Sequence, residues 1–123
     1  MMNGRHVATG KRVLVAEDEY FIAKGIARHL KAIGAEVVGP VATIADALKL
    51  VEAEQLDGAV LDINLRGDLV FPVADALVAR DVPIVFATGY GPGAIPERYA
   101  PIPRCEKPAE PQAFIQELFG RTA

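Results

Sequence analysis

Cysteine is nearly absent from this sequence of 123 residues, and the single Cys105 excludes a disulfide bond within the chain. Such sparing use of cysteine is typical of a reducing compartment. No apolar run approaches the length of about 20 residues that a membrane-spanning helix needs. The first nine residues also lack the apolar segment of a secretion signal. We therefore expect a cytoplasmic protein that does not use a membrane as a partner.

Basic residues are not in excess either. The 13 lysines and arginines are outnumbered by 16 aspartates and glutamates, which gives a net charge of −3. A chain of this charge has no basic surface for nucleic acid, so we expect no nucleic-acid partner. Its length fits one domain with its own core. We expect residues 1–10 to form a flexible N-terminal tail and residues 11–120 to form the folded domain.

Short apolar runs alternate along the chain with segments whose apolar residues recur at helical spacing. Apolar runs of this length are typical of strands that are buried on both faces of a parallel sheet. Strands alternating with helices imply right-handed crossovers and helices on both faces of the sheet. The strands are expected at 13–16, 36–40, 59–62, 83–87 and 102–106, and the helices at 21–33, 44–51, 70–79 and 111–119.

The segment 89–103 breaks this alternation. It contains three glycines and four prolines, although a helix is due at this point of the chain. Because proline cannot donate a backbone hydrogen bond and clashes with the preceding turn, the four prolines exclude a long helix. We expect a loop with at most one short helical turn near 96–99.

Chemically notable residues follow the ends of the predicted strands. Glu17 and Asp18 follow the first strand, Asp62 ends the third, Thr88 follows the fourth and Lys107 follows the fifth. The carboxyl ends of parallel strands meet at one edge of the sheet, where open α/β sheets bind ligands, so these groups converge there. Three carboxylates in one place repel one another, and their joint ionisation is favourable only when a cation binds among them.

Oxygen-only ligands of this kind suit Mg²⁺ or Mn²⁺. A lysine and a hydroxyl beside the cation suit a phosphoryl group, to which they contribute a point charge and a hydrogen-bond donor. A carboxylate beside such a pocket can attack phosphorus and form an acyl phosphate. The residues therefore indicate phosphoryl chemistry at this edge of the sheet.

The chain resembles the receiver domain of bacterial two-component response regulators. The resemblance covers roughly residues 11–120 and rests on residues that follow strand ends in the order of that family: Glu17-Asp18, Asp62, Thr88 and Lys107-Pro108. It implies a CheY-like, flavodoxin-like (βα)₅ fold, a doubly wound parallel sheet with strand order 2-1-3-4-5. It also implies that Asp62 accepts a phosphoryl group from a histidine kinase or a histidine phosphotransfer protein in a Mg²⁺-dependent reaction.

The resemblance assigns a role to each residue of the site. Asp18, Asp62 and the backbone carbonyl of Asn64 would bind Mg²⁺ or Mn²⁺, and Glu17 would assist through water. Lys107 would pair with the phosphoryl oxygens. The protein would thus phosphorylate itself from a donor and hydrolyse its own phosphate, without being an enzyme that turns over a separate substrate.

The resemblance also predicts a switch. Thr88 would hydrogen-bond a phosphoryl oxygen when the domain changes conformation. The position three residues before Lys107 usually holds an aromatic side chain in the family, but here it holds Arg104. We therefore expect Tyr90, or a rearrangement of the loop after the fourth strand, to carry the signal in place of that aromatic residue. The bond before Pro108 is often cis in the family, which makes it a candidate cis peptide here.

A narrower resemblance is visible in the sequence Phe86-Ala87-Thr88-Gly89-Tyr90. It is similar to a receiver subclass that is common in alphaproteobacteria, is often single-domain, and has a loop in place of a regular fourth helix. We therefore expect a stand-alone receiver with a fourth helix that is short or replaced by a loop. We expect a monomer or weak dimer that acts on a downstream protein target, which the sequence does not identify.

Three other functions remain open at this point. The first is a Mg²⁺-dependent phosphohydrolase with an aspartyl nucleophile. Such enzymes usually carry two aspartates two residues apart after the first strand, whereas position 64, two residues beyond Asp62, is Asn. The second is a phosphate-independent binding module with a vestigial site. The third is a flavin-binding flavodoxin, although no hydroxyl-rich phosphate loop follows the first strand.

Overall fold

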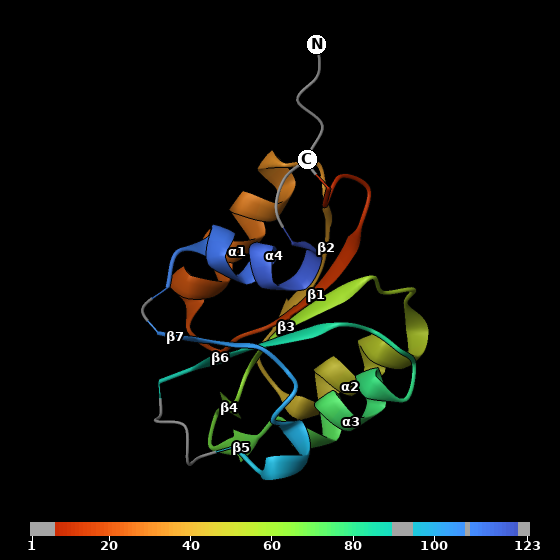
Figure 1. Cartoon of the computed structure of the whole chain (residues 1–123), viewed down its shortest axis with the longest axis vertical. Coiled ribbons are helices and arrows are strands. Elements are labelled where there is room, and N and C mark those ends of the chain that lie inside the picture. The colour runs from red at the N-terminus through yellow and green to blue at the C-terminus, as the bar shows by residue number, and fades with distance from the viewer. Residues whose placement is uncertain (1–6, 90–94, 108, 121–123) are drawn as a thin grey trace.

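The computed structural model describes residues 7–89, 95–107 and 109–120 (Figure 1). At its centre is a five-stranded parallel sheet with the strand order β2-β1-β3-β6-β7. Since β6 and β7 are the fourth and fifth strands of this sheet, the predicted order 2-1-3-4-5 is confirmed. The strands are β1 (Arg12–Ala16), β2 (Glu36–Val41), β3 (Gly58–Asp62), β6 (Ile84–Thr88) and β7 (Arg104–Glu106).

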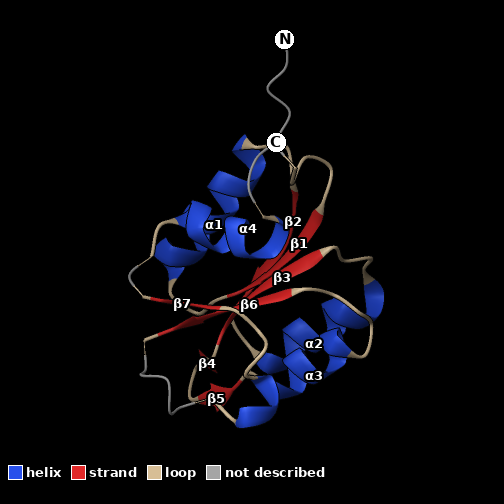
Figure 2. Cartoon of the chain, in the orientation of Figure 1, coloured by secondary structure: helices blue, strands red, loops and turns tan. Residues whose placement is uncertain are grey.

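The helices cover both faces of the sheet, as the doubly wound fold requires (Figure 2). On one face lie α1 (Tyr20–Ala32) and α4 (Pro111–Phe119), and on the other lie α2 (Ile44–Ala53) and α3 (Phe71–Val78). The signals at their ends are those expected from the sequence. The Thr43 hydroxyl caps α2 by accepting a hydrogen bond from the Asp46 amide at 3.2 Å. Gly34 follows α1 with a left-handed φ of 86°. No helix in the described ranges is both long enough and apolar enough to span a membrane.

Two hydrophobic clusters hold the helices against the sheet. Every residue of β3 is buried, and because successive side chains of a strand point to opposite faces, its residues divide between the clusters. Leu61 packs with residues of α2 and α3, whereas Val60 packs with residues of α1 and α4. This burial on both faces explains why the strand is an unbroken apolar run up to Asp62.

The packed part of the chain begins before the predicted residue 11. Ala8 is fully buried against the cluster under α1 and α4. The Thr9 hydroxyl donates to the carbonyl of Ile33 at 2.9 Å, and the Gly10 amide donates to the carbonyl of Gly34 at 2.8 Å. Residues 8–10 thus differ from the predicted flexible tail, because they pack on the end of α1. Residues 1–6 lie outside the described residues.

The segment between β6 and β7 carries the short 3₁₀ helix η2 (Glu97–Tyr99), where one helical turn was expected. Tyr99 at its end is 3% exposed and stacks on Phe71, with 4.8 Å between ring centroids. It also meets the edge of Phe86 in β6, at 6.1 Å. Its hydroxyl donates to Asp75 Oδ1 at 2.5 Å and accepts a hydrogen bond from Arg98. These contacts hold η2 against α3 and against the face of the sheet that α2 and α3 cover.

A small hairpin follows β3 and was not predicted. Strand β4 (Asn64–Leu65) pairs antiparallel with β5 (Asp68–Leu69). The sequence indicated only turn residues after Asp62. Two-residue strands are too short to show the alternation from which a strand is recognised.

Candidate functional site

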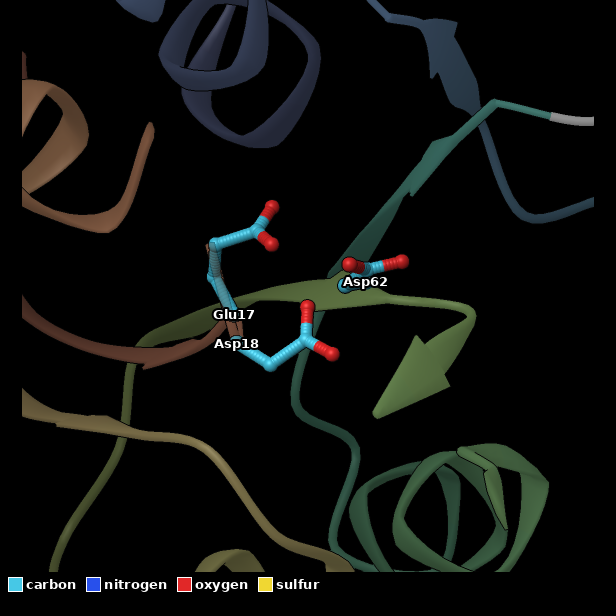
Figure 3. Close-up of side chains that lie close together, drawn as sticks. All are labelled: Glu17, Asp18 and Asp62. Atoms are coloured by element: carbon cyan, nitrogen blue, oxygen red, sulfur yellow. The ribbon is translucent and has the colours of Figure 1, made fainter. Parts of the chain in front are cut away.

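The site lies at the carboxyl edge of the sheet. Glu17 and Asp18 follow β1, and Asp62 is the last residue of β3. Because β1 and β3 are parallel neighbours, the three carboxylates meet, and Figure 3 shows them pointing toward one another. One oxygen atom from each carboxylate lies within 4.8 Å of the other two. The convergence predicted from the sequence is therefore present in the structure.

Lys107 completes this cluster from the end of β7. Its ammonium Nζ lies 2.8 Å from Glu17 Oε1 and 2.8 Å from Asp62 Oδ2. Both carboxylates are buried, with 3% of Glu17 and 6% of Asp62 exposed. A buried carboxylate is costly unless it is paired, and here a single ammonium serves two of them. With Asp18 added, the cluster holds three acidic groups and one basic group.

This charge imbalance perturbs the proton affinities of the site. Burial, together with the nearby Asp62, raises the pKa of Glu17 to about 7, against the opposing effect of Lys107. Burial acts to lower the pKa of Lys107, but its contacts with Asp62 and Glu17 outweigh burial, so that pKa is raised. For Asp18, burial acts to raise the pKa, but the hydrogen bond from the Arg66 amide and contacts with the other carboxylates hold it below its ordinary value.

The donor set fits a hard divalent cation. All three ligand atoms are carboxylate oxygens, and metal–oxygen distances of about 2.0–2.6 Å allow one such ion to be shared by oxygens this close together. A cation would also neutralise the acidic excess that Lys107 leaves. An open depression of about 390 Å³ lies beside the carboxylates, and its lining includes Asn64, Gly89 and Lys107. The depression has room for a phosphoryl group and water.

Thr88 and Lys107 are joined through the backbone. Thr88 ends β6 and is 1% exposed, and its carbonyl accepts a hydrogen bond from the Lys107 amide at 2.8 Å. This bond continues the pairing of β6 with β7 and places the lysine at the edge where Asp62 lies. The half-buried Arg104 lies one strand across from Phe86, on the same sheet.

The structure does not test the predicted roles of three residues of the site. Tyr90 and Pro108 lie outside the described residues, so their roles stay predictions. The cis peptide bond that the structure describes is Gly39-Pro40, which was not predicted. Asn64 donates its backbone amide to Asp62 Oδ1 at 3.1 Å, and the role of its carbonyl as a metal ligand stays a prediction.

One contact in the site could not be predicted from the sequence. The backbone amide of Arg66 donates a hydrogen bond to Asp18 Oδ2 at 2.9 Å, across 48 residues of sequence. A backbone donor has no side-chain signature. The only available hint was the Arg66-Gly67 turn, which places the chain near the end of β3.

The chain was compared with protein-family models, with curated proteins and with solved structures. No protein-family model matches the chain. Among curated proteins, the transcriptional regulatory protein PdtaR of Mycobacterium tuberculosis is 32% identical over 92 residues, which make up 74% of this chain and 45% of PdtaR. The chain therefore spans less than half the length of this curated relative.

Solved structures match this chain over nearly the whole of their own length, as two examples show. SdrG from Sphingomonas melonis is 38% identical, with a TM-score of 0.77 over 89% of this chain and 96% of SdrG. The receiver (REC) domain of the PhyR response regulator from Erythrobacter litoralis is 25% identical, with a TM-score of 0.75 over 89% of this chain and 90% of that domain.

A parallel sheet of this order, with acidic residues and a lysine at its carboxyl edge, defines a CheY-like protein of the flavodoxin-like fold. Since the relatives that match along their length are receivers of this kind, the chain belongs to the family of response regulator receiver domains.

Proposed function

We propose that this chain is a phosphoacceptor of a two-component pathway, in which a histidine kinase or a histidine phosphotransfer protein phosphorylates Asp62. The observation that carries the proposal is the position of the Asp62 carboxylate. It lines an open depression, 2.8 Å from the Lys107 ammonium and close to two further carboxylates. A nucleophile, a cation site and a basic group for phosphoryl oxygens are thus within reach of one another.

The proposed reaction transfers a phosphoryl group from a phosphohistidine of the donor to the Asp62 carboxylate. One oxygen of Asp62 attacks the phosphorus of the donor phosphohistidine, a phosphorus–oxygen bond forms, and the phosphorus–nitrogen bond breaks. The leaving electron pair stays on the imidazole nitrogen. Bound Mg²⁺, held by Asp18 and Asp62 with help from Glu17, would supply charge neutralisation for the phosphoryl oxygens.

Lys107 contributes in both states of the site. In the unphosphorylated state its ammonium pairs with Asp62 and Glu17. After transfer the Asp62 carboxylate has become an acyl phosphate, and the ammonium can follow the negative charge to a phosphoryl oxygen. Thr88, at the neighbouring strand end, offers the hydroxyl that binds another of these oxygens.

We place the response to phosphorylation in the segment that follows Thr88. The described part of this segment has a single short turn, η2, where the alternation of the fold calls for a helix. This is in keeping with membership of the Phe-Ala-Thr-Gly subclass. SdrG, the 38% identical relative, has also been solved in a BeF₃-activated conformation, and this similarity supports a phosphoryl-responsive site in the present chain. A protein target would recognise the rearranged segment.

The test is the intact mass of the protein after incubation with acetyl phosphate and Mg²⁺. We expect the gain of one phosphoryl group, and we expect Asp62→Asn or an excess of EDTA to abolish it. The matched control is Asp81→Asn, which changes an exposed aspartate before β6, at the opposite edge of the sheet, and should phosphorylate like the wild type.

Two results would contradict the proposal. An adduct that persists in Asp62→Asn would place the acceptor elsewhere. Steady turnover of phosphate esters by the wild type, abolished by Asp62→Asn, would support a phosphohydrolase. If acetyl phosphate gives no adduct, phosphotransfer from a phosphorylated histidine phosphotransfer domain is the second assay, and failure there would support a vestigial site.

A further inference from the structure

The hairpin after β3 has a two-residue turn, Arg66-Gly67, between β4 and β5. Both turn residues have left-handed backbone conformations, with φ of 52° at Arg66 and 92° at Gly67. Two-residue hairpin turns of this hand favour glycine and asparagine, and an arginine there is unusual. The turn therefore depends on contacts that hold it in place.

Three contacts fix the hairpin beside the site. The side-chain oxygen Oδ1 of Asn64 accepts a hydrogen bond from the Gly67 amide at 2.7 Å, across the turn. Leu65 is 1% exposed and packs in the core under α2 and α3. At the base of the hairpin, the Val70 amide donates to the carbonyl of Ile63 at 2.8 Å. These contacts stabilise the conformation of the turn and hold the hairpin at the end of β3.

The locked turn aims one backbone donor at the acidic cluster. The Arg66 amide donates to Asp18 Oδ2 at 2.9 Å. Asp18 is the exposed member of the cluster, whereas Glu17 and Asp62 are buried. An exposed carboxylate rotates freely unless something holds it. Within the described residues, this hydrogen bond ties Asp18 to the segment that directly follows Asp62.

We propose that the β4–β5 hairpin is a positioning element for the cation site, in which the Arg66 amide holds the Asp18 carboxylate in its metal-binding orientation. The Arg66 side chain is not the acting group, since the donor is the peptide nitrogen. Asn64 acts through the turn, because its side chain holds the conformation that presents this nitrogen. The inference rests on the proposed function, since it takes the three carboxylates to be a Mg²⁺ site.

The experiment compares substitutions at position 66 that differ in how well they tolerate the left-handed conformation. Arg66→Val places a β-branched residue at a positive φ, so it should displace the turn and its amide. Arg66→Gly removes the same side chain but favours the conformation and keeps the amide. Leu69→Val, at an exposed position of β5, is the control for a change elsewhere in the hairpin.

The first readout is the dissociation constant for Mg²⁺, obtained by titration of backbone amide shifts. Loss of the hydrogen bond that orients Asp18 predicts that Arg66→Val binds Mg²⁺ about threefold to tenfold more weakly than the wild type, which is the factor that one ordinary hydrogen bond contributes. Arg66→Gly should bind Mg²⁺ at least as tightly as the wild type does, because it keeps the amide in place and removes a positive charge near the cation. Circular dichroism of each variant shows whether it is folded, and Gly67→Ala, at the neighbouring left-handed position, replaces Arg66→Val if that variant is not.

The second readout needs no metal. In Asp18→Ala the amide of Arg66 loses its acceptor, so its proton signal should move upfield and exchange faster with solvent. If that signal does not change, the proposed hydrogen bond is refuted.

The outcomes separate this inference from the proposed function. If the wild type binds Mg²⁺ and folded Arg66→Val binds it equally well, only the positioning role of the hairpin fails. Equal weakening in Arg66→Val and Arg66→Gly would assign the effect to the side chain and also overturn the role of the amide. If the wild type binds no Mg²⁺, the cation site fails and this inference with it.

Discussion

Glu17→Gln should stabilise the metal-free protein at alkaline pH. Glu17 is 3% exposed and shares the Lys107 ammonium with Asp62, so its ionised form is poorly compensated. Glutamine has the same shape and carries no charge. Its one side-chain oxygen can keep one of the two contacts that the Glu17 carboxylate now makes, either with the Glu19 amide at 3.0 Å or with the Lys107 ammonium at 2.8 Å.

The size of the effect follows from the perturbed pKa. Glu17 titrates at about 7 in the folded protein, against 4.5 for an ordinary glutamate. The folded state therefore binds this proton more tightly than the unfolded state. The stability that results is complete below about pH 4.5 and is lost as the pH rises through 7. At about 1.36 kcal/mol for a tenfold change in proton affinity, the loss approaches about 3 kcal/mol at full ionisation.

The assay is urea unfolding in EDTA, followed by far-ultraviolet circular dichroism between about pH 5 and pH 9, the range in which Glu17 titrates. As the pH rises over this range, we expect the free energy of unfolding of Glu17→Gln to increase relative to that of the wild type by up to about 3 kcal/mol. Glu19→Gln is the matched control, because it neutralises an exposed neighbour and should leave the pH profile unchanged.

An identical pH dependence of wild type and Glu17→Gln would refute the reasoning, as would a variant that is less stable than the wild type at pH 9. Mg²⁺ should narrow this difference in stability between Glu17→Gln and the wild type. A ligand stabilises the form that binds it more tightly, so saturating Mg²⁺ should raise the stability of the wild type more than that of Glu17→Gln.

Three further predictions, two on substitutions and one on the reactivity of a thiol, test the packing of the fold. Tyr99→Phe removes the hydroxyl that donates a hydrogen bond to Asp75. The Asp75 carboxylate is solvent-exposed and can bind water instead, so we expect the free energy of unfolding in urea to fall by only about 1 kcal/mol. An unchanged stability would contradict the anchoring of η2 by this bond. Thr43→Ala removes the cap of α2 and should cost about 1 kcal/mol, whereas Thr43→Ser should retain most of the stability; equal losses would show that the cap is not the cause. Burial, with a smaller effect from Glu117, raises the pKa of the Cys105 thiol, so its alkylation by iodoacetamide at neutral pH should be slower than that of glutathione, and an equal rate would be evidence against this.

The sequence by itself determined the sheet and the location of the site. Strands buried on both faces must be apolar throughout, so their ends were readable where Glu17 and Asp62 interrupt the apolar runs. The alternation of strands with helices then implied a parallel sheet, in which those ends lie on one edge. The helix boundaries at Thr43 and Gly34 could also be predicted, because capping depends on residues close together in sequence.

Contacts between distant backbone groups were decided only by the tertiary structure. The Arg66 amide meets Asp18 across 48 residues, and such a contact leaves no mark in the sequence because every residue except proline has this donor. The burial of Ala8 likewise depends on where α1 ends in space, not on the residues around it.

The proton affinities of the site were decided in the same way. The sequence showed that Glu17, Asp62 and Lys107 would meet, but not that a single ammonium would lie 2.8 Å from both carboxylates in a buried setting. A pKa depends on the loss of water and on the distance to each charge. Only the folded chain fixes these two quantities, and it raises the pKa of Glu17 to about 7.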